Sequence, residues 1–371
     1  RRSSDLITLT VALLSSATAM LMWILLKQKR LQCIIGIGIA MLPALLMVTN
    51  VNRLEGATVQ MRWRSFGTGN ELLKSIDSPY QNIAIGKRLE QYSVFCNGHF
   101  TLNFPDPYMN ATLAKLLVSE ADKPRSALII GGGIEGLLTQ LHLADVKTIH
   151  YVQIDPWLVR AIISFLPPSE RMVLKRAGIK LFYTDARQFV YSTRERYDLI
   201  FLHLGDPSTA LLNRYYTLEF FKLVREHLTD RGIFALHITA SESYFGPGVA
   251  EYVASIYHTL KRAFPNIAIA VGETTYFFAT RHRGLVSESP EELMRRVQWL
   301  GQSRTQDDSG AQLDSHTMRN SSIMDEFSVR TIPPEVLYAF FPPLRADWMR
   351  EQLMLIRRRI GEERANRILL N

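Results

Sequence analysis

Three glycines and an acid have the spacing of a nucleotide-binding loop. The segment Ser126–Gly136, SALIIGGGIEG, is an apolar run that ends in glycines, and Gly131, Gly133 and Gly136 fit the pattern G-x-G-x-x-G. Such a loop lets the backbone approach a ligand closely, and Asp155, 19 positions after Gly136, stands where an acid binds ribose hydroxyls. Nicotinamide enzymes and methyltransferase-type nucleoside enzymes share this arrangement, so the loop alone does not choose between them.

Two later strand ends carry acidic side chains. Asp185 follows one apolar run, where its carboxylate is suited to accept a hydrogen bond from an adenine amino group. The alternative is that Asp185 only caps the next helix. Asp206 lies in Gly205-Asp206-Pro207, just after a second apolar run. Because ligands of open α/β sheets bind outside the carboxyl ends of the strands, we expect both acids to face one crevice.

A parallel sheet is needed to bring these residues together. After Pro124 the chain alternates short apolar runs with helical periodicity, which is typical of a Rossmann-like, methyltransferase-type, doubly wound α/β fold. The predicted parallel strands are Ala127–Ile130, Thr148–Ile154, Lys180–Tyr183, Leu199–Leu204 and Ile233–Ile238. Ala268–Val271 and Tyr276–Ala279 are expected to close the sheet as an antiparallel pair.

The rest of the chain divides by composition. We predict two transmembrane helices over residues 1–50, a polar connector over 51–75, a small antiparallel β domain over 76–105, the nucleoside-binding domain over 106–282, and a helical carboxyl-terminal segment over 283–371 with a polar loop at 302–322. Alternating residues on both sides of Asn97-Gly98, a hairpin signal, indicate the β domain.

Two uncharged apolar runs predict the membrane spans. Leu6–Leu26 has 21 residues, Leu31–Thr49 has 19, and Lys27–Arg30 separates them. Each run is long enough to cross the hydrocarbon core of a bilayer, although a signal peptide or a buried helical hairpin is the alternative. Since the expected chemistry needs a cytosolic nucleoside, we predict an integral protein of the bacterial inner membrane with its α/β domain in the cytoplasm.

Basic residues cluster near the end of the chain. The net charge is +8, and Arg345–Arg367 has the pattern of a basic amphipathic helix. Such a helix either lies on an anionic membrane surface or packs its apolar face on its own domain. The chain contains no nucleic-acid-binding module, and Cys33 and Cys96 lack the spacing of metal ligands. We therefore expect neither a nucleic-acid partner nor a metal.

From Ser78 to Thr280 a series of motifs follows a distinctive order. The motifs are SPYQNIAI, NGHF, LIIGGG, QID, TDARQF and YDLIFLHLGDP followed by YYTLEFF. The series resembles the spermidine/spermine synthase family, the aminopropyltransferases, and DPSTALLNRYYTLEFF and SESYFGPGVAEYVASIYHTL are similar to the subgroup fused to multi-pass membrane segments. The resemblance implies a Rossmann-like catalytic domain, decarboxylated S-adenosylmethionine as donor, a polyamine as acceptor and no tightly bound cofactor.

The resemblance also assigns roles by position. Gln81 would touch the donor, Gln153 the ribose, Asp185 the adenine and Asp206 the amine. The other residues expected around the nucleoside are Gly131, Gly132, Gly133, Glu135, Gly136, Asp155 and Ala186.

The chain departs from the family pattern at charged positions. Ile134 and Glu135 stand where the glycine loop usually has Asp and Gly, Gln153 replaces a glutamate, and His203 replaces the catalytic aspartate. Carboxylates take a proton from an ammonium and hold a polycation, whereas a neutral His203 can do only the first. The alternative is that His203 has no catalytic role and is only hydrogen-bonded at the strand end.

We therefore predict a membrane-anchored aminopropyltransferase-like protein that binds decarboxylated S-adenosylmethionine, methylthioadenosine or S-adenosylmethionine, with an altered amine acceptor or weak activity. One alternative is a catalytically inactive scaffold or accessory subunit of a membrane complex, with membrane protein partners or a second copy of the chain. Another is an NAD-dependent oxidoreductase, which only the glycine pattern supports. The expected partners in the first case are the lipid bilayer and a small nucleoside.

Overall fold

The computed structural model describes residues 16, 17, 21, 56–66, 69–240, 247–272, 274–300, 327–342 and 345–356. The chain divides into an amino-terminal unit, Arg1–Asn103, and a carboxyl-terminal unit, Phe104–Asn371. The predicted polar loop 302–322 lies outside the described residues, as do both predicted spans apart from Ser16, Ala17 and Leu21. In the described part of the chain, no helix is both long and apolar enough to cross a membrane.

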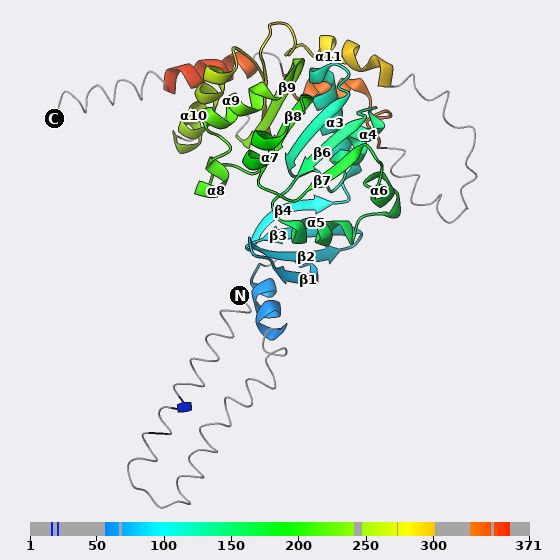
Figure 1. Ribbon diagram of the computed structural model, residues 1–371, viewed down its shortest axis with the longest axis vertical. Helices are drawn as coiled ribbons and strands as arrows, with labels where there is room; N and C mark the ends of the chain where they lie inside the picture. Colours follow the sequence, from blue (N-terminus) through cyan, green and yellow to red (C-terminus); the bar gives the residue numbers. More distant parts are fainter. Residues whose placement is uncertain are drawn as a thin grey trace, which may run out of the picture. The chain divides into compact units, whose positions relative to one another are not determined.

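The amino-terminal unit is built on a four-stranded sheet (Figure 1). Its strands, in spatial order, are β1 (Glu71–Asp77), β2 (Asn82–Arg88), β3 (Gln91–Cys96) and β4 (His99–Phe104). Strand β2 pairs antiparallel with β1 and with β3. Asn97 and Gly98 join β3 to β4 and both have positive φ, as the tight turn of a twisted hairpin requires.

A helix at residues 56–65 occupies part of the predicted polar connector. Its Trp63 is buried with Ala84 and Phe95 and donates from Nε1 to the Asn70 carbonyl oxygen at 2.7 Å. Gly86 makes room for the indole, because a Cβ at that position would lie 2.3 Å from the Trp63 ring. Phe66 stacks on Phe95 beside the indole, with ring centroids 5.7 Å apart, so two aromatic residues anchor a segment that its polar sequence had suggested to be a connector.

The carboxyl-terminal unit contains a seven-stranded sheet in the order β10-β11-β9-β8-β5-β6-β7. The strands are β5 (Ser126–Gly131), β6 (Thr148–Val152), β7 (Ile179–Phe182), β8 (Tyr197–His203), β9 (Leu228–Thr239), β10 (Asn266–Ala270) and β11 (Thr274–Thr280). Strands β5 to β9 pair in parallel, whereas β11 pairs antiparallel with β9 and β10. The predicted Rossmann-like sheet is confirmed.

Two groups of helices pack on this sheet (Figure 1). Alternate residues of the parallel strands share a core with α7 (Ala186–Ser192), α9 (Leu218–Glu226) and α10 (Pro247–Ala263). Helix α3 (Pro107–Ala121) contacts β8 and β9 as well as α4 (Leu137–Leu143) and α11 (Pro290–Val297). The shorter helices are α5 (Pro156–Ile163), α6 (Pro168–Val173), α8 (Ala210–Asn213) and the 3-10 helix η2 (Pro334–Ala339).

The helix at residues 345–356 packs on its own unit. Met349 and Leu353 are fully buried in the core shared with α9 and α10. Arg350 pairs with Glu288, and its Nη1 lies 3.1 Å from Asp347 Oδ1. For this part of the predicted basic amphipathic helix, the structure therefore favours packing over a membrane surface as the role of the apolar face. Residues 357–367 lie outside the described residues.

The strand order reverses at β5, which has β6 on one side and β8 on the other. In open α/β sheets ligands bind outside the carboxyl ends of the strands at such a reversal. The residues that follow β5, β6, β7 and β8 are therefore the ones that a ligand of this unit would meet.

Candidate active site

The glycine loop follows β5 directly and lies against the end of β8. Gly131 has a φ of 100°, and a Cβ there would lie 2.5 Å from the His203 carbonyl oxygen. Gly132 N donates to the same oxygen at 2.7 Å. Gly136 has a φ of 150° and packs on Asn110 of α3, whose Nδ2 would lie 2.7 Å from an added Cβ. The loop is therefore tied to β8 and α3 at positions that admit only glycine.

Glu135 turns into this loop. Its Oε2 accepts from Gly133 N at 2.9 Å, and the side chain is buried. Burial raises the pKa of the Glu135 carboxyl, which its hydrogen bond to Gly133 partly offsets. Ile134 beside it is also buried. Glu135 thus closes the loop on itself, and its predicted place beside the nucleoside stays a prediction.

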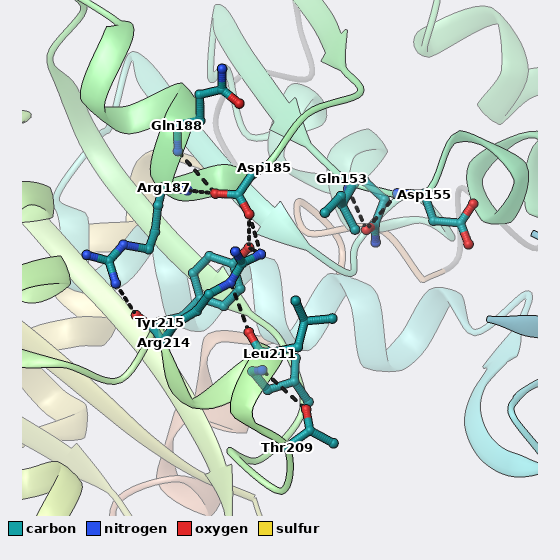
Figure 2. Close-up of polar contacts among 11 residues, drawn as sticks. Gln153, Asp155, Asp185, Arg187, Gln188, Thr209, Leu211, Arg214 and Tyr215 are labelled. Carbon is teal, nitrogen blue, oxygen red and sulfur yellow. Dashed lines mark hydrogen bonds and ion pairs between the residues drawn. The ribbon is translucent and has the colours of Figure 1, made fainter. Parts of the chain in front are cut away.

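Gln153 and Asp155 follow β6 and bond to the backbone (Figure 2). Gln153 Nε2 donates to the Gly131 carbonyl oxygen at 3.1 Å, and its Oε1 accepts from Ile154 N at 2.8 Å. Asp155 is 1% exposed, and its Oδ1 caps α5 by accepting from Trp157 N at 3.0 Å. Gln153 therefore lies beside the glycine loop as expected, whereas Asp155 is engaged in holding the start of α5.

Asp185 is both a helix cap and the centre of a polar cluster (Figure 2). Its Oδ1 accepts from Arg187 N at 2.9 Å and from Gln188 N at 3.1 Å, at the start of α7. Its Oδ2 forms an ion pair with Arg214 and accepts from the Tyr215 hydroxyl at 3.0 Å. Asp185 therefore caps α7 through Oδ1, whereas its Oδ2 makes no hydrogen bond with the backbone of α7. The neighbouring Ala186 is buried as the first residue of α7.

Aromatic and imidazole rings cluster near the carboxyl ends of β8 and β9. His203 stacks on Phe201 with ring centroids 4.8 Å apart and meets the edge of His237 at 4.9 Å. Tyr276 of β11 lies 5.8 Å from His237. In the part of the chain that the structure describes, Nδ1 of His203 and Nε2 of His237 are buried without a hydrogen-bond partner.

Both imidazoles are neutral at physiological pH. Burial lowers the pKa of His203 to about 3, with His237 as the next cause, and burial lowers the pKa of His237 to about 4. A neutral imidazole can accept a proton or a hydrogen bond. It brings no negative charge to hold a cation, so this face of the sheet binds cations less strongly than a carboxylate in the same place would.

Asp206 lies just after β8 among hydroxyl groups and backbone. Its Oδ1 accepts from Thr239 N at 2.9 Å, which links the exit of β8 to the end of β9. Tyr216 donates to the Gly205 carbonyl oxygen at 3.0 Å, and Tyr252 donates to the Thr239 carbonyl oxygen. Asp206 therefore ties the exit of β8 to the end of β9, and its predicted contact with an amine stays a prediction.

Gln81 belongs to the amino-terminal unit. It closes the turn before β2, where its carbonyl oxygen accepts from Ser78 N at 2.9 Å. With Arg62, Tyr80 and Asn97 it lines a cavity of about 480 Å³. Its predicted contact with the donor stays a prediction.

Three residues of this region, His237, Arg214 and Tyr215, had no role predicted from the sequence. His237 interrupts an otherwise apolar strand, Ile233–Ile238, one residue before its end, which is a usable signal. Arg214 lies 29 positions from Asp185 along the chain, and no local pattern links the two.

A seven-stranded sheet whose order reverses beside a glycine loop defines a Rossmann-like α/β class of protein. Residues 108–277 match the family described as Spermine/spermidine synthase domain. This match agrees with the resemblance to the spermidine/spermine synthase family, the aminopropyltransferases, that the motifs indicated.

Named relatives agree with this assignment. The chain is 28% identical over 204 residues to polyamine aminopropyltransferase 2 of Aquifex aeolicus, covering 53% of this chain and 39% of that protein. It is 29% identical to the polyamine aminopropyltransferase of Prochlorococcus marinus, covering 57% of this chain and 73% of that protein. The chain spans 39% and 45% of the length of the A. aeolicus and Oceanobacillus iheyensis relatives.

The fold is also that of a solved structure. A crystal structure of spermidine synthase in complex with the transition-state analogue AdoDATO matches with a TM-score of 0.57 and 17% identity, covering 77% of this chain and 89% of that chain. These relatives lend no support to the oxidoreductase alternative.

Proposed function

We propose that this chain is an aminopropyltransferase-like transferase that binds an adenosyl ligand, with decarboxylated S-adenosylmethionine as the donor. The observation that carries the proposal is that the glycine loop, Gln153 and Asp185 follow β5, β6 and β7, so all three lie at the carboxyl edge of the parallel strands. These groups supply close backbone approach, a ribose partner and an acceptor for an adenine amino group. The family of residues 108–277 supports the same ligand class.

The proposed reaction is a single displacement. A neutral amine nitrogen attacks the carbon next to the donor sulfonium, the carbon–sulfur bond breaks, and methylthioadenosine leaves with the electron pair. The acceptor must lose one proton overall. Asp206 is proposed to attract the amine and to accept its proton, whereas His203, whose pKa is lowered by burial to about 3, is proposed to accept a hydrogen bond from the amine.

The acceptor is proposed to carry fewer positive charges than a polyamine. Putrescine and spermidine bear roughly two and three charges near neutral pH, since the pKa of an alkyl ammonium lies near that of lysine, about 10. The β8 end offers Asp206, whereas Ile134 and His203 stand at two other positions where the family pattern has acids. We therefore propose little or no synthesis of spermidine from putrescine.

Membrane anchoring is a further part of the proposal and rests on the sequence alone. Leu6–Leu26 and Leu31–Thr49 are proposed to anchor the chain in a bacterial inner membrane, with the α/β unit in the cytoplasm. Protease added outside sealed, right-side-out vesicles should then leave the α/β unit intact. Its digestion under those conditions would contradict the cytoplasmic placement.

The activity is tested by following methylthioadenosine release from decarboxylated S-adenosylmethionine with the full chain in detergent. Putrescine and spermidine are compared with primary amines of a single charge. We expect release that depends on an acceptor and is faster with the monoamines. Rapid turnover of putrescine would contradict the altered acceptor. Donor binding without release to any amine would instead favour the inactive scaffold.

A further inference from the structure

A short segment after β8 folds back onto the predicted adenine site (Figure 2). Thr209 starts it, since its hydroxyl accepts from Leu212 N at 3.2 Å and its carbonyl oxygen accepts from Asn213 N at 2.8 Å. These bonds form the single turn of α8, and Arg214 comes next in the chain. Residues Thr209–Arg214 are called the α8 segment below.

The Arg214 guanidinium is fixed by several contacts. Nε donates to the Leu211 carbonyl oxygen at 3.0 Å, and Nη2 donates to the Tyr215 hydroxyl at 2.8 Å and pairs with Asp185 Oδ2. The carbonyl oxygen of Arg214 accepts from Arg187 Nη1 at 3.2 Å. The side chains of Arg214 and Asp185 are 32% and 20% exposed, so the ion pair is partly shielded from water.

These contacts fill the acceptor capacity of Asp185. A carboxylate offers about four lone-pair positions. Two backbone N–H groups take Oδ1, and Arg214 and Tyr215 take Oδ2. Burial, with Asp185 as the next cause, raises the pKa of Tyr215 to about 12, so its hydroxyl remains a donor at neutral pH. An adenine amino group could reach Oδ2 only by displacing one of these donors.

We propose that Arg214 competes with the nucleobase for Asp185, so that the α8 segment closes the adenine site of the free protein and must release Asp185 when an adenosyl ligand binds. The proposal rests on the proposed function, because it takes Asp185 as the partner of adenine. It makes Arg214 a determinant of nucleoside affinity that acts by occupying the site.

The competition is tested by calorimetric titration of the full chain with methylthioadenosine. Arg214→Met keeps an apolar stem and removes the guanidinium, and it should tighten binding by roughly three- to tenfold, the range expected when a partly exposed ion pair no longer has to be broken. Arg231→Met is the matched control, because it makes the same charge change at an exposed pair with Asp122. Its affinity should equal that of the wild type.

A double-mutant cycle separates competition from a general effect of charge. In an Asp185→Asn background, where the partner of Arg214 has lost its charge but can still cap α7, Arg214→Met should change affinity by less than twofold. Melting temperatures show that each variant is folded, and Arg214→Lys, which cannot form the same fork, replaces Arg214→Met if that variant fails to fold.

The outcomes separate the two proposals. If Arg214→Met binds methylthioadenosine as tightly as the wild type or more weakly, the proposed competition is wrong, whereas the proposed nucleoside site is unaffected. An equal gain in both Asp185 backgrounds also overturns it. Absence of methylthioadenosine binding in every variant overturns the proposed function, and the competition with it.

Discussion

His203 is the residue on which the chemistry of the site depends, because it stands where the family pattern has a carboxylate. Its imidazole is stacked on Phe201, touches His237 and is neutral. The substitution itself was evident from the sequence. The low pKa of His203 could not be predicted from the sequence, because it comes from burial and from His237 on another strand. Local sequence patterns do not reveal partners that are distant in the chain.

Restoring carboxylates should restore affinity for a polycation. The paired substitutions His203→Asp and Ile134→Asp are expected to raise the rate of spermidine formation from putrescine above that of the wild type, since partly buried charge-assisted contacts contribute roughly 1–3 kcal/mol each. Formation of spermidine is measured by mass spectrometry. His203→Asn with Ile134→Asn is the uncharged control, and an equal rate in both pairs would show that charge is not what the site lacks.

The buried imidazoles also predict an acid-sensitive fold. The pKa of His203 is about 3 in the folded chain and about 6.5 when unfolded, so the unfolded state binds a proton first as the pH falls. The free energy of unfolding is therefore unaffected by this group above about pH 6.5 and falls as the pH drops towards 3. At pH 5 the decrease should be roughly 2 kcal/mol. His203→Asn should lose less melting temperature than the wild type between pH 7 and pH 5. Equal losses would mean that His203 titrates normally in the folded chain.

At the scale of elements, the apolar runs and glycines were enough to place the parallel strands and the loop after β5. Each strand is a local feature, and its partner follows from the right-handed connections of α/β folds. The helix at residues 56–65 and the contact of the α8 segment with Asp185 were not predictable in the same way. Trp63 packs on Ala84 and Phe95, and Arg214 contacts Asp185, so the partners of both residues lie far away in the sequence.

The attachment of the glycine loop to β8 can be tested by adding one methyl group. Gly131→Ala would place a Cβ 2.5 Å from the His203 carbonyl oxygen at a φ of 100°. We expect destabilisation by more than about 1 kcal/mol, together with weaker nucleoside binding, because the strand end must shift. Gly205→Ala is the matched control, since nothing lies within 4 Å of its added Cβ. Similar melting temperatures for the two variants would contradict the close packing of the loop.

At the scale of the whole molecule, the chain combines a small β-sheet unit, a Rossmann-like unit that matches the spermine/spermidine synthase domain, and two apolar runs near its start. The sequence predicted the Rossmann-like unit well because many strands repeat the same signal. Membrane insertion depends on the lipid around the chain, and the choice of acceptor depends on which charged side chains meet it in the site; both stay proposals.

The most direct test is calorimetric titration of the full chain in detergent with four ligands: decarboxylated S-adenosylmethionine, methylthioadenosine, S-adenosylmethionine and NAD. Methylthioadenosine and the decarboxylated donor should bind, NAD should not, and Asp185→Ala should weaken methylthioadenosine binding by roughly 1–3 kcal/mol because a buried polar group loses its partner. Asp122→Ala, at the exposed pair with Arg231, should leave it unchanged. Binding of NAD in preference to methylthioadenosine, or no binding of any adenosyl ligand, would contradict the assignment of an adenosyl site to the carboxyl edge of this sheet.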